Sequence, residues 1–259
     1  MNKFTAPGGL EIFHNSIAEA KYIYSEVFEH RVYFRHGISL DRGGTVFDIG
    51  ANIGIFTMFI RENFPQTTVH AFEPSPQNFE ALCANTKKYG PSVRPQKCGV
   101  GKSPGEAVLT FYPQCSMMST LHSNAANEQQ ILRAGILGAL KEKGVTEVPE
   151  HLLQPMVDKV LQAKQEYTVP ICTISDAIEA GGLNEVALIK IDTEGSELDV
   201  LQGIRADHWG LIGQFVIEAH SDADRRSIVE ILEARGFKCT VEQEGRLSGA
   251  ELFNCYAKR

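Results

Sequence analysis

Two stretches of the sequence place residues able to bind a nucleoside directly after apolar segments. They are Val46–Gly54 (VFDIGANIG) and Val69–Pro74 (VHAFEP). In an open α/β sheet, the small residues of such a first turn let a ligand approach the backbone, and a lone acid after the second strand accepts the ribose hydroxyls. The pattern therefore predicts a nucleoside site in which Glu73 is that acid.

The glycine spacing of the first stretch discriminates between nucleosides. The dinucleotide fingerprint is Gly-x-Gly-x-x-Gly, whereas Asn52 and Ile55 stand where its second and third glycines would be. A side chain at the second position keeps the backbone away from a pyrophosphate, and the Lys-Ser/Thr pair of a Walker loop is absent as well. A ligand with a ribose and no phosphates, such as S-adenosylmethionine, fits better. An ordinary strand and glycine turn is the alternative, but Asp48, the two glycines and Glu73 together disfavour it.

Three motifs resemble the signature blocks of the FkbM-type class I methyltransferases. They are Phe47–Gly54, Ala71–Pro74 and Ile189–Glu197 (IKIDTEGSE), and the third is the most specific. The resemblance is firm from Thr45 to His220. It implies a Rossmann-like class I methyltransferase fold, S-adenosyl-L-methionine as cofactor and S-adenosyl-L-homocysteine as product.

The N-terminal region resembles one subgroup of that family, found in polyketide and peptide-synthetase pathways of natural product biosynthesis. The matching segments are Tyr22–Phe28, Tyr33–Gly37 and Thr173–Asp176. This resemblance implies a small-molecule acceptor that is free or tethered to an acyl or peptidyl carrier protein.

The composition is typical of a globular protein without a membrane span. The chain has 259 residues, enough for one well-cored α/β domain, with 43% hydrophobic and 22% charged residues. A formal charge of -7 argues against nucleic acid as a partner, because Lys and Arg provide most of that affinity. No apolar run is long enough to span a membrane, and Met1–Phe4 lacks the apolar core of a secretory signal. Six cysteines without a C-x-x-C pair indicate reduced thiols, so we expect a cytoplasmic protein.

The chain divides into an N-terminal arm at 1–43, expected to pack on the core, and a methyltransferase domain at 44–259. From Thr45 onward apolar strands alternate with helical segments, which predicts a seven-stranded, mostly parallel sheet. The predicted strands are 45–49, 68–72, 93–98, 186–191, 213–219, 237–243 and 251–258. The last two flank the turn 244–246 and form a hairpin at the sheet edge, so the last strand is expected to run antiparallel.

Helices are predicted between these strands and in one insertion. The predicted helices in the arm and the core are 19–28, 55–62, 76–89, one ending at 203, and 223–235. The insertion, 116–167, carries two more: Leu132, Ile136 and Leu140 share one face of the first, and 152–161 supplies the second. These helices either complete the core or form a lid that selects the acceptor, as insertions at the ligand-binding edge often do.

The cofactor is expected beyond the carboxyl ends of the first three strands. The predicted contacts are Asp48, Gly50, Ala51, Asn52, Gly54, Glu73, Pro74, Ser75, Asn78, Gly99, Val100 and Asp192. The glycines are expected to permit close backbone approach, and the amides of the turn to face the methionyl carboxylate.

Each remaining contact has an expected role. Asp48 is expected to accept from the ammonium group, Glu73 from both ribose hydroxyls. Pro74 and Ser75, with the two residues after the third strand, are expected to border the adenine. Asn78 either reaches the ribose side or, as we prefer, caps the helix.

Residues after the fourth and fifth strands are expected to face the methyl group. His220 is our first choice of base, because an unperturbed imidazole is neutral at cellular pH and can accept a proton. Glu218, two residues away, is expected to orient it, while Asp192 and Glu194 bind the ammonium group or the acceptor. Alternatively, Glu218 and His220 are a structural polar pair, and Glu194 with Glu197 favours the dipole of the following helix.

These acids and His220 are also hard oxygen and imidazole donors, although we expect no metal. The predicted function is transfer of a methyl group to a hydroxyl of a small natural-product intermediate. N-methylation, O-methylation of a sugar or lipid, and a non-catalytic S-adenosylmethionine-binding module are the alternatives, while Asn52 and Ile55 disfavour a dehydrogenase. Tyr22, Tyr24 and Tyr33 of the arm either line the same site or pack.

Overall fold

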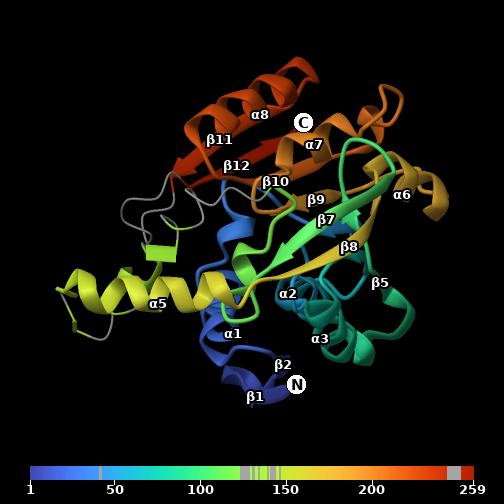
Figure 1. Cartoon of the computed structure of the whole chain (residues 1–259). Helices are drawn as coiled ribbons and strands as arrows, with labels where there is room; N and C mark the ends of the chain where they lie inside the picture. Colours follow the sequence, from blue (N-terminus) through green and yellow to red (C-terminus); the bar gives the residue numbers. More distant parts are fainter. Residues whose placement is uncertain are drawn as a thin grey trace.

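A seven-stranded sheet forms the centre of the protein (Figure 1). The computed structural model describes residues 1–40, 43–122, 129, 132–133, 135–138, 140, 144–145, 147–243 and 252–259. The strand order is β11-β12-β10-β9-β3-β4-β5. Their bounds are β3 Gly44–Ile49, β4 Thr67–Phe72, β5 Val93–Gln96, β9 Leu188–Ile191, β10 Gln214–Ala219, β11 Lys238–Gln243 and β12 Phe253–Lys258.

The direction of these strands confirms the predicted fold class. β3 pairs in parallel with β4 and β9, β4 with β5, and β9 with β10, whereas β12 runs antiparallel to both β10 and β11. The predicted edge hairpin is therefore present, and its turn at 244–246 lies outside the described residues. The third predicted strand, 93–98, ends at Gln96 because the chain then leaves for a second sheet.

Helices cover both faces of the sheet, which explains why its central strands read as continuous apolar runs. On one face lie α6 and α8, and on the other α1 and α2 with part of α3 (Figure 1). The helices are α1 Ile17–Tyr24, α2 Ile55–Asn63, α3 Pro76–Thr86, α5 Glu150–Gln162, α6 Ile174–Gly181, α7 Glu197–Gln202 and α8 Asp222–Ala234. Phe47 and Ile49 of β3 pack toward α6 and α8, while Val46 packs toward α2, as the alternation of a strand requires.

The arm has more structure than the sequence predicts. β1 (Asn2–Thr5) and β2 (Glu11–His14) form an antiparallel hairpin, and the predicted helix 19–28 is α1 followed by a π-helical turn, Ser25–Glu29. Val27 and Val32 are buried in the same cluster as α2. Short 3₁₀ segments lie at Pro7–Gly9, Val32–Phe34, Lys87–Ser92, Ser116–Met118 and Trp209–Leu211.

The connection between β5 and β9 contains a small sheet that the sequence did not reveal. Its order is β6-β8-β7, with β6 Gly99–Val100, β7 Gly105–Phe111 and β8 Gln165–Cys172. Within the insertion, Leu132 lies in a helical segment and packs on Leu153 and Val157 of α5. The two predicted helical faces therefore pack against each other and form a cluster separate from the main core. In the part of the chain that the structure describes, no helix is long and apolar enough to cross a membrane.

Candidate active site

The predicted site residues gather at one edge of the sheet. Ile49, at the end of β3, is in register with Phe72 of β4 and Ile191 of β9, and Ile191 is in register with Ile217 of β10. The loops that follow β3, β4 and β9 therefore open side by side with the end of β10. Ligands of such sheets bind outside these carboxyl ends.

The glycines of the first turn are also required by packing against the protein itself. Gly50 (φ +76°) has the Asp192 carbonyl oxygen 1.8 Å from where a Cβ would lie. At Gly54 (φ +88°), a Cβ would lie 2.7 Å from Leu82 Cδ1. The turn therefore sits directly on the end of β9 and on α3. Asn52 also has a left-handed backbone (φ +50°), where asparagine is tolerated better than most residues.

Glu73 forms the centre of the nucleoside half of the site. Its side chain is buried, Oε2 accepts the Asn52 N–H at 2.9 Å, and Oε1 accepts the Ser75 N–H at 2.8 Å. Burial raises the pKa of Glu73 to about 7, although both N–H groups favour the ionised form. Each carboxylate oxygen accepts one bond here and has capacity for another. The pair of oxygens can therefore accept two ribose hydroxyls.

The region expected to border the adenine is preformed. Ser75 caps α3, because its Oγ accepts the Asn78 N–H at 3.4 Å. The expectation that Asn78 is the cap is therefore wrong; its Oδ1 instead accepts from Asn15 Nδ2 of the arm at 3.3 Å. A Cβ on Gly99 would lie 3.9 Å from Pro74 Cβ, so the chain after β5 lies beside the Glu73 loop.

Most of the predicted cofactor contacts are buried. Asp48 is fully buried, with Oδ2 accepting from Thr57 Oγ1 at 2.6 Å. Ala51 packs in a small apolar cluster next to the sheet, and Val100 belongs to the main core. Asp192, by contrast, keeps 23% of its side chain exposed at the site.

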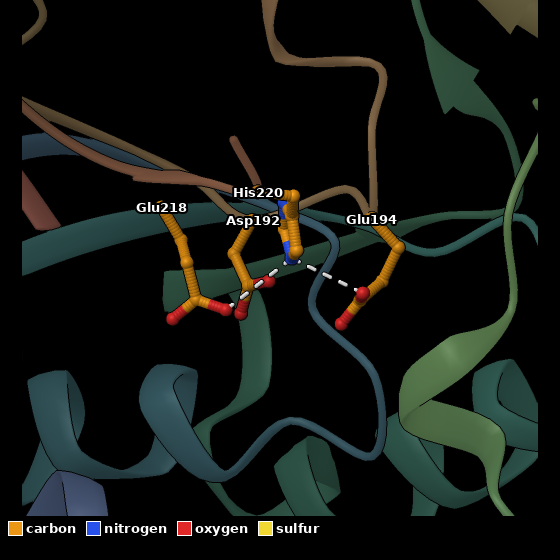
Figure 2. A group of neighbouring side chains, drawn as sticks. All are labelled: Asp192, Glu194, Glu218 and His220. Carbon is orange, nitrogen blue, oxygen red and sulfur yellow. Dashed lines mark ion pairs between the residues drawn. The ribbon is translucent and has the colours of Figure 1, made fainter. Parts of the chain in front are cut away.

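The second half of the site, named the acceptor half after its expected role, is a cluster of four ionisable side chains, Asp192, Glu194, Glu218 and His220 (Figure 2). His220 Nε2 lies 3.1 Å from Glu194 Oε2 and 3.5 Å from Glu218 Oε1. Glu194 has a left-handed backbone (φ +55°), and its carbonyl accepts from Thr120 Oγ1 at 2.7 Å. Such strain in a residue with a Cβ is typical of functional sites.

Glu197 holds the other side of the imidazole. Its side chain is almost fully buried, and Oε1 lies 3.4 Å from His220 Nδ1. The same oxygen accepts from the Thr193 N–H and hydroxyl and from the Gly195 N–H. Burial would raise the pKa of Glu197, but His220 and these donors outweigh it and lower the pKa to about 2. Glu197 is therefore a fixed negative charge that orients His220.

These carboxylates overturn the expectation that His220 is a neutral imidazole. Burial lowers its pKa, but Glu194 and Glu197 outweigh burial and raise the pKa well above 6.5. Burial, and then Asp192, raises the pKa of Glu218 to about 7. At neutral pH the cluster thus contains an imidazolium beside a carboxyl group poised to exchange a proton.

The same four side chains could also ligate a cation. One donor atom from each of Asp192, Glu194, Glu218 and His220 lies within 4.8 Å of all the others. Carboxylate oxygens with one imidazole suit a hard divalent ion. The arrangement suits two chemical uses, proton transfer within the cluster or coordination of a divalent ion. The effect of a chelator on activity distinguishes them.

The sequence-based prediction gives no role to Lys190, and for Tyr33 it leaves open whether the residue lines the site or packs. Lys190 is buried between Asp48 and Asp192, and Tyr33 of the arm contacts Asp192. A lysine inside the apolar run of β9 was the available signal, because a charge there needs partners. Of the other arm tyrosines singled out, Tyr24 donates to the carbonyl of Pro7, away from this cluster.

Comparison with known proteins gives consistent matches. A family model described as the methyltransferase FkbM domain matches residues 48–239. The 31-O-demethyl-FK506 methyltransferase FkbM of Streptomyces tacrolimicus is 35% identical over 255 residues, covering 98% of this chain and 95% of that protein.

Two further matches extend the comparison. The AMB antimetabolite synthetase AmbE of Pseudomonas aeruginosa is 30% identical over 98% of this chain, which corresponds to 12% of AmbE. Among solved structures, Aeropyrum pernix fibrillarin with natively bound S-adenosyl-L-methionine aligns with a TM-score of 0.46 and 9% identity, covering 92% of this chain and 74% of fibrillarin.

Proposed function

Since the chain belongs to the FkbM family of S-adenosylmethionine-dependent methyltransferases, we propose that it methylates a hydroxyl group of a small natural-product intermediate. The observation that carries the proposal is one sheet edge with two chemically different halves. Glu73 stands at the half suited to a nucleoside, and the proton-exchanging cluster around His220 stands at the other. Methyl transfer to oxygen needs both.

The first half suits the nucleoside of S-adenosylmethionine, whose sulfonium supplies an activated methyl group. Glu73 is assigned to the ribose hydroxyls. Its carboxylate accepts a hydrogen bond from the Asn52 N–H, which keeps the carboxylate oriented toward the first turn. Asp192 is assigned to the ammonium of the methionyl group, because it is partly exposed and pairs with Lys190, which donates to the Gly50 carbonyl of the first turn. Pro74, Ser75 and Gly99 are assigned to the adenine border.

The second half is assigned to the acceptor. A hydroxyl must lose its proton as it attacks the methyl group, and a base with a pKa near the operating pH does this best. Glu218, whose pKa is about 7, meets this condition better than the imidazolium beside it. The proton therefore moves to a Glu218 oxygen, while His220 orients and balances it from 3.5 Å. Glu194 holds His220 from the other side.

The insertion is assigned to acceptor selection. Thr120, at its start, donates to the Glu194 carbonyl, and the Met117 N–H donates to Glu19 of the arm at 3.0 Å. Arm, insertion and acidic loop are thus joined beside the acceptor half. AmbE, a synthetase similar to this chain over part of its length, supports an acceptor tethered to a carrier protein.

N-methylation is the second candidate, and the charge of the site favours it. Asp192, Glu194 and Glu218 would attract a protonated amine as well as a hydroxyl. A deprotonated amine needs no base in the transfer step itself, so loss of Glu218 would affect the two reactions differently.

A mass-spectrometric assay tests the proposed function. The protein is incubated with S-adenosylmethionine and paired hydroxyacyl and aminoacyl substrates, each free and loaded on a carrier protein. We expect a mass gain of one methyl group on a hydroxyacyl substrate. Methyl transfer to the aminoacyl substrate alone would mean that the reaction is N-methylation and not O-methylation. Binding of S-adenosylhomocysteine by calorimetry without transfer to any member of the panel would favour a non-catalytic module.

A further inference from the structure

Lys190 is a buried cation at the junction of the two halves of the site. It lies in β9 with 3% exposure, and its ammonium donates to the Gly50 carbonyl at 2.8 Å. The same nitrogen lies 3.4 Å from Asp48 Oδ1 and 3.2 Å from Asp192 Oδ2. It therefore connects the first turn with the carboxylate that follows β9.

The oxygen atoms around Lys190 belong to the protein. Its ammonium donates one hydrogen bond, to the Gly50 carbonyl, and forms ion pairs with Asp48 and Asp192. Burial lowers the pKa of Lys190, but Asp192 and Asp48 outweigh burial and raise it. The group stays protonated, so it does not act as a base.

Tyr33 holds Asp192 from the arm. Its hydroxyl donates to Asp192 Oδ2 at 3.2 Å, the same oxygen that faces Lys190. Its ring centre lies 5.7 Å from the Lys190 nitrogen, and the ring packs edge-on against Phe56 of α2. Burial and then Asp192 raise the pKa of Tyr33 well above 10, so the phenol remains a donor.

We propose that Lys190 and Tyr33 are positioning residues that fix Asp192, and through it the methionyl end of the cofactor. The inference rests on the proposed function, because it gives Asp192 the ammonium group of S-adenosylmethionine. Lys190 also ties the Gly50 turn to the end of β9, so the turn and the carboxylate move together. The arm thereby contributes to cofactor binding with one hydroxyl.

The test is calorimetric titration with S-adenosylhomocysteine, which needs no acceptor. Tyr33→Phe removes one hydroxyl without a change in shape, and we expect Kd to rise roughly threefold to tenfold, as for one lost hydrogen bond. Tyr24→Phe is the matched control, because it also removes the hydroxyl of a buried arm tyrosine but one bonded to Pro7. The control is expected to bind as wild type.

Lys190 needs a paired variant, because Lys190→Met alone would leave the buried Asp48 and the partly exposed Asp192 without their cation. Asp48→Asn with Lys190→Met removes the charges of this pair together, and we expect S-adenosylhomocysteine affinity to fall roughly tenfold or more. Once an acceptor is known, the KM for S-adenosylmethionine should rise in both variants while kcat changes less. A purely structural role would lower thermal stability without this split.

The outcomes separate the two proposals. If wild-type protein does not bind S-adenosylhomocysteine, the proposed function fails and this inference with it. If wild type binds but Tyr33→Phe and the Asp48→Asn, Lys190→Met protein bind equally well, the cofactor site stands and the positioning role is wrong. Equal losses in Tyr33→Phe and Tyr24→Phe would also overturn it.

Discussion

The nucleoside half of the site and its acceptor half lie at one sheet edge but are built differently. The nucleoside half consists of backbone turns with left-handed residues, buried glycines and one carboxylate, Glu73, held by two amides. The acceptor half consists of side chains, with His220 held between Glu194 and Glu197 and Glu218 beside it. The structure of the nucleoside half thus depends on backbone geometry, and that of the acceptor half depends on the ionisation of its side chains.

This difference explains what each half can do. A turn fixed by packing keeps its amides and Glu73 in place before a ligand arrives, which favours tight recognition of one cofactor. In a cluster of interacting ionisable groups, an entering ligand changes the pKa values of all the members, because each charge affects the pKa of the others. We therefore expect the chemistry to occur in the acceptor half.

The largest expected effect comes from breaking the acceptor half at its centre. His220→Ala removes the positive charge that Glu194, Glu197 and Glu218 surround, and we expect turnover to fall ~10²-fold or more, the scale of general acid–base catalysis. The measurement is kcat with a fixed acceptor. His30→Ala is the control, since His30 is exposed on the arm. Unchanged turnover in His220→Ala would remove this residue from the mechanism.

The pH dependence of turnover tests the role of Glu218 in the acceptor half. Because the pKa of Glu218 is raised to about 7, the base is ionised above that pH and protonated below it. Turnover of the wild type should therefore rise as pH increases through about 7. Glu218→Gln should lower kcat by ~10²-fold and flatten this part of the profile. A Glu218→Gln enzyme with the wild-type profile would assign the proton to another group.

Gly50 tests the claim that the nucleoside half is determined by packing. Gly50→Ala places a Cβ on the Asp192 carbonyl at a positive φ, so we expect the free energy of unfolding to fall by about 2 kcal/mol or more. Gly105→Ala is the control, because its Cβ would meet no atom within 4 Å. Urea unfolding of both variants measures the difference. Equal stability of the two would mean that the Gly50 turn adapts to a side chain.

The smallest expected effect is that of a chelator on the acceptor half. We expect EDTA to leave turnover unchanged, because protonated His220 already supplies a positive charge among the carboxylates. A rate lost with EDTA and restored by Mg²⁺ would instead place a cation among Asp192, Glu194, Glu218 and His220.

The sequence predicted the main sheet because its signals are local. Glycine turns, apolar runs and helix ends follow from neighbouring residues, so the strand directions and the edge hairpin were predicted correctly. The β6-β8-β7 sheet was missed because β8, which pairs with both β6 and β7, lies far from them in the chain. The N-terminal hairpin was missed although Pro7-Gly8-Gly9 is a strong turn signal, because the two strands that flank it have only four residues each.

Those parts of the site that depend on local sequence signals could also be predicted. The positions of Glu73 and the acidic residues after β9 and β10 follow from strand ends. Three properties depend on tertiary contacts instead: the reason for Gly50, the charge of His220 and the burial of Asp48 against Lys190. A pKa that Glu194 and Glu197 raise through tertiary contacts cannot be read from the order of residues along the chain.

The most direct test of the division into two halves is one set of calorimetric titrations with S-adenosylhomocysteine. Wild type, Glu73→Gln and His220→Ala are compared. We predict that Glu73→Gln loses roughly tenfold or more in affinity, since a carboxylate that accepts hydroxyls becomes a neutral amide, while His220→Ala binds as wild type. Equal binding by Glu73→Gln and wild type, or an equal loss in both variants, would contradict the account.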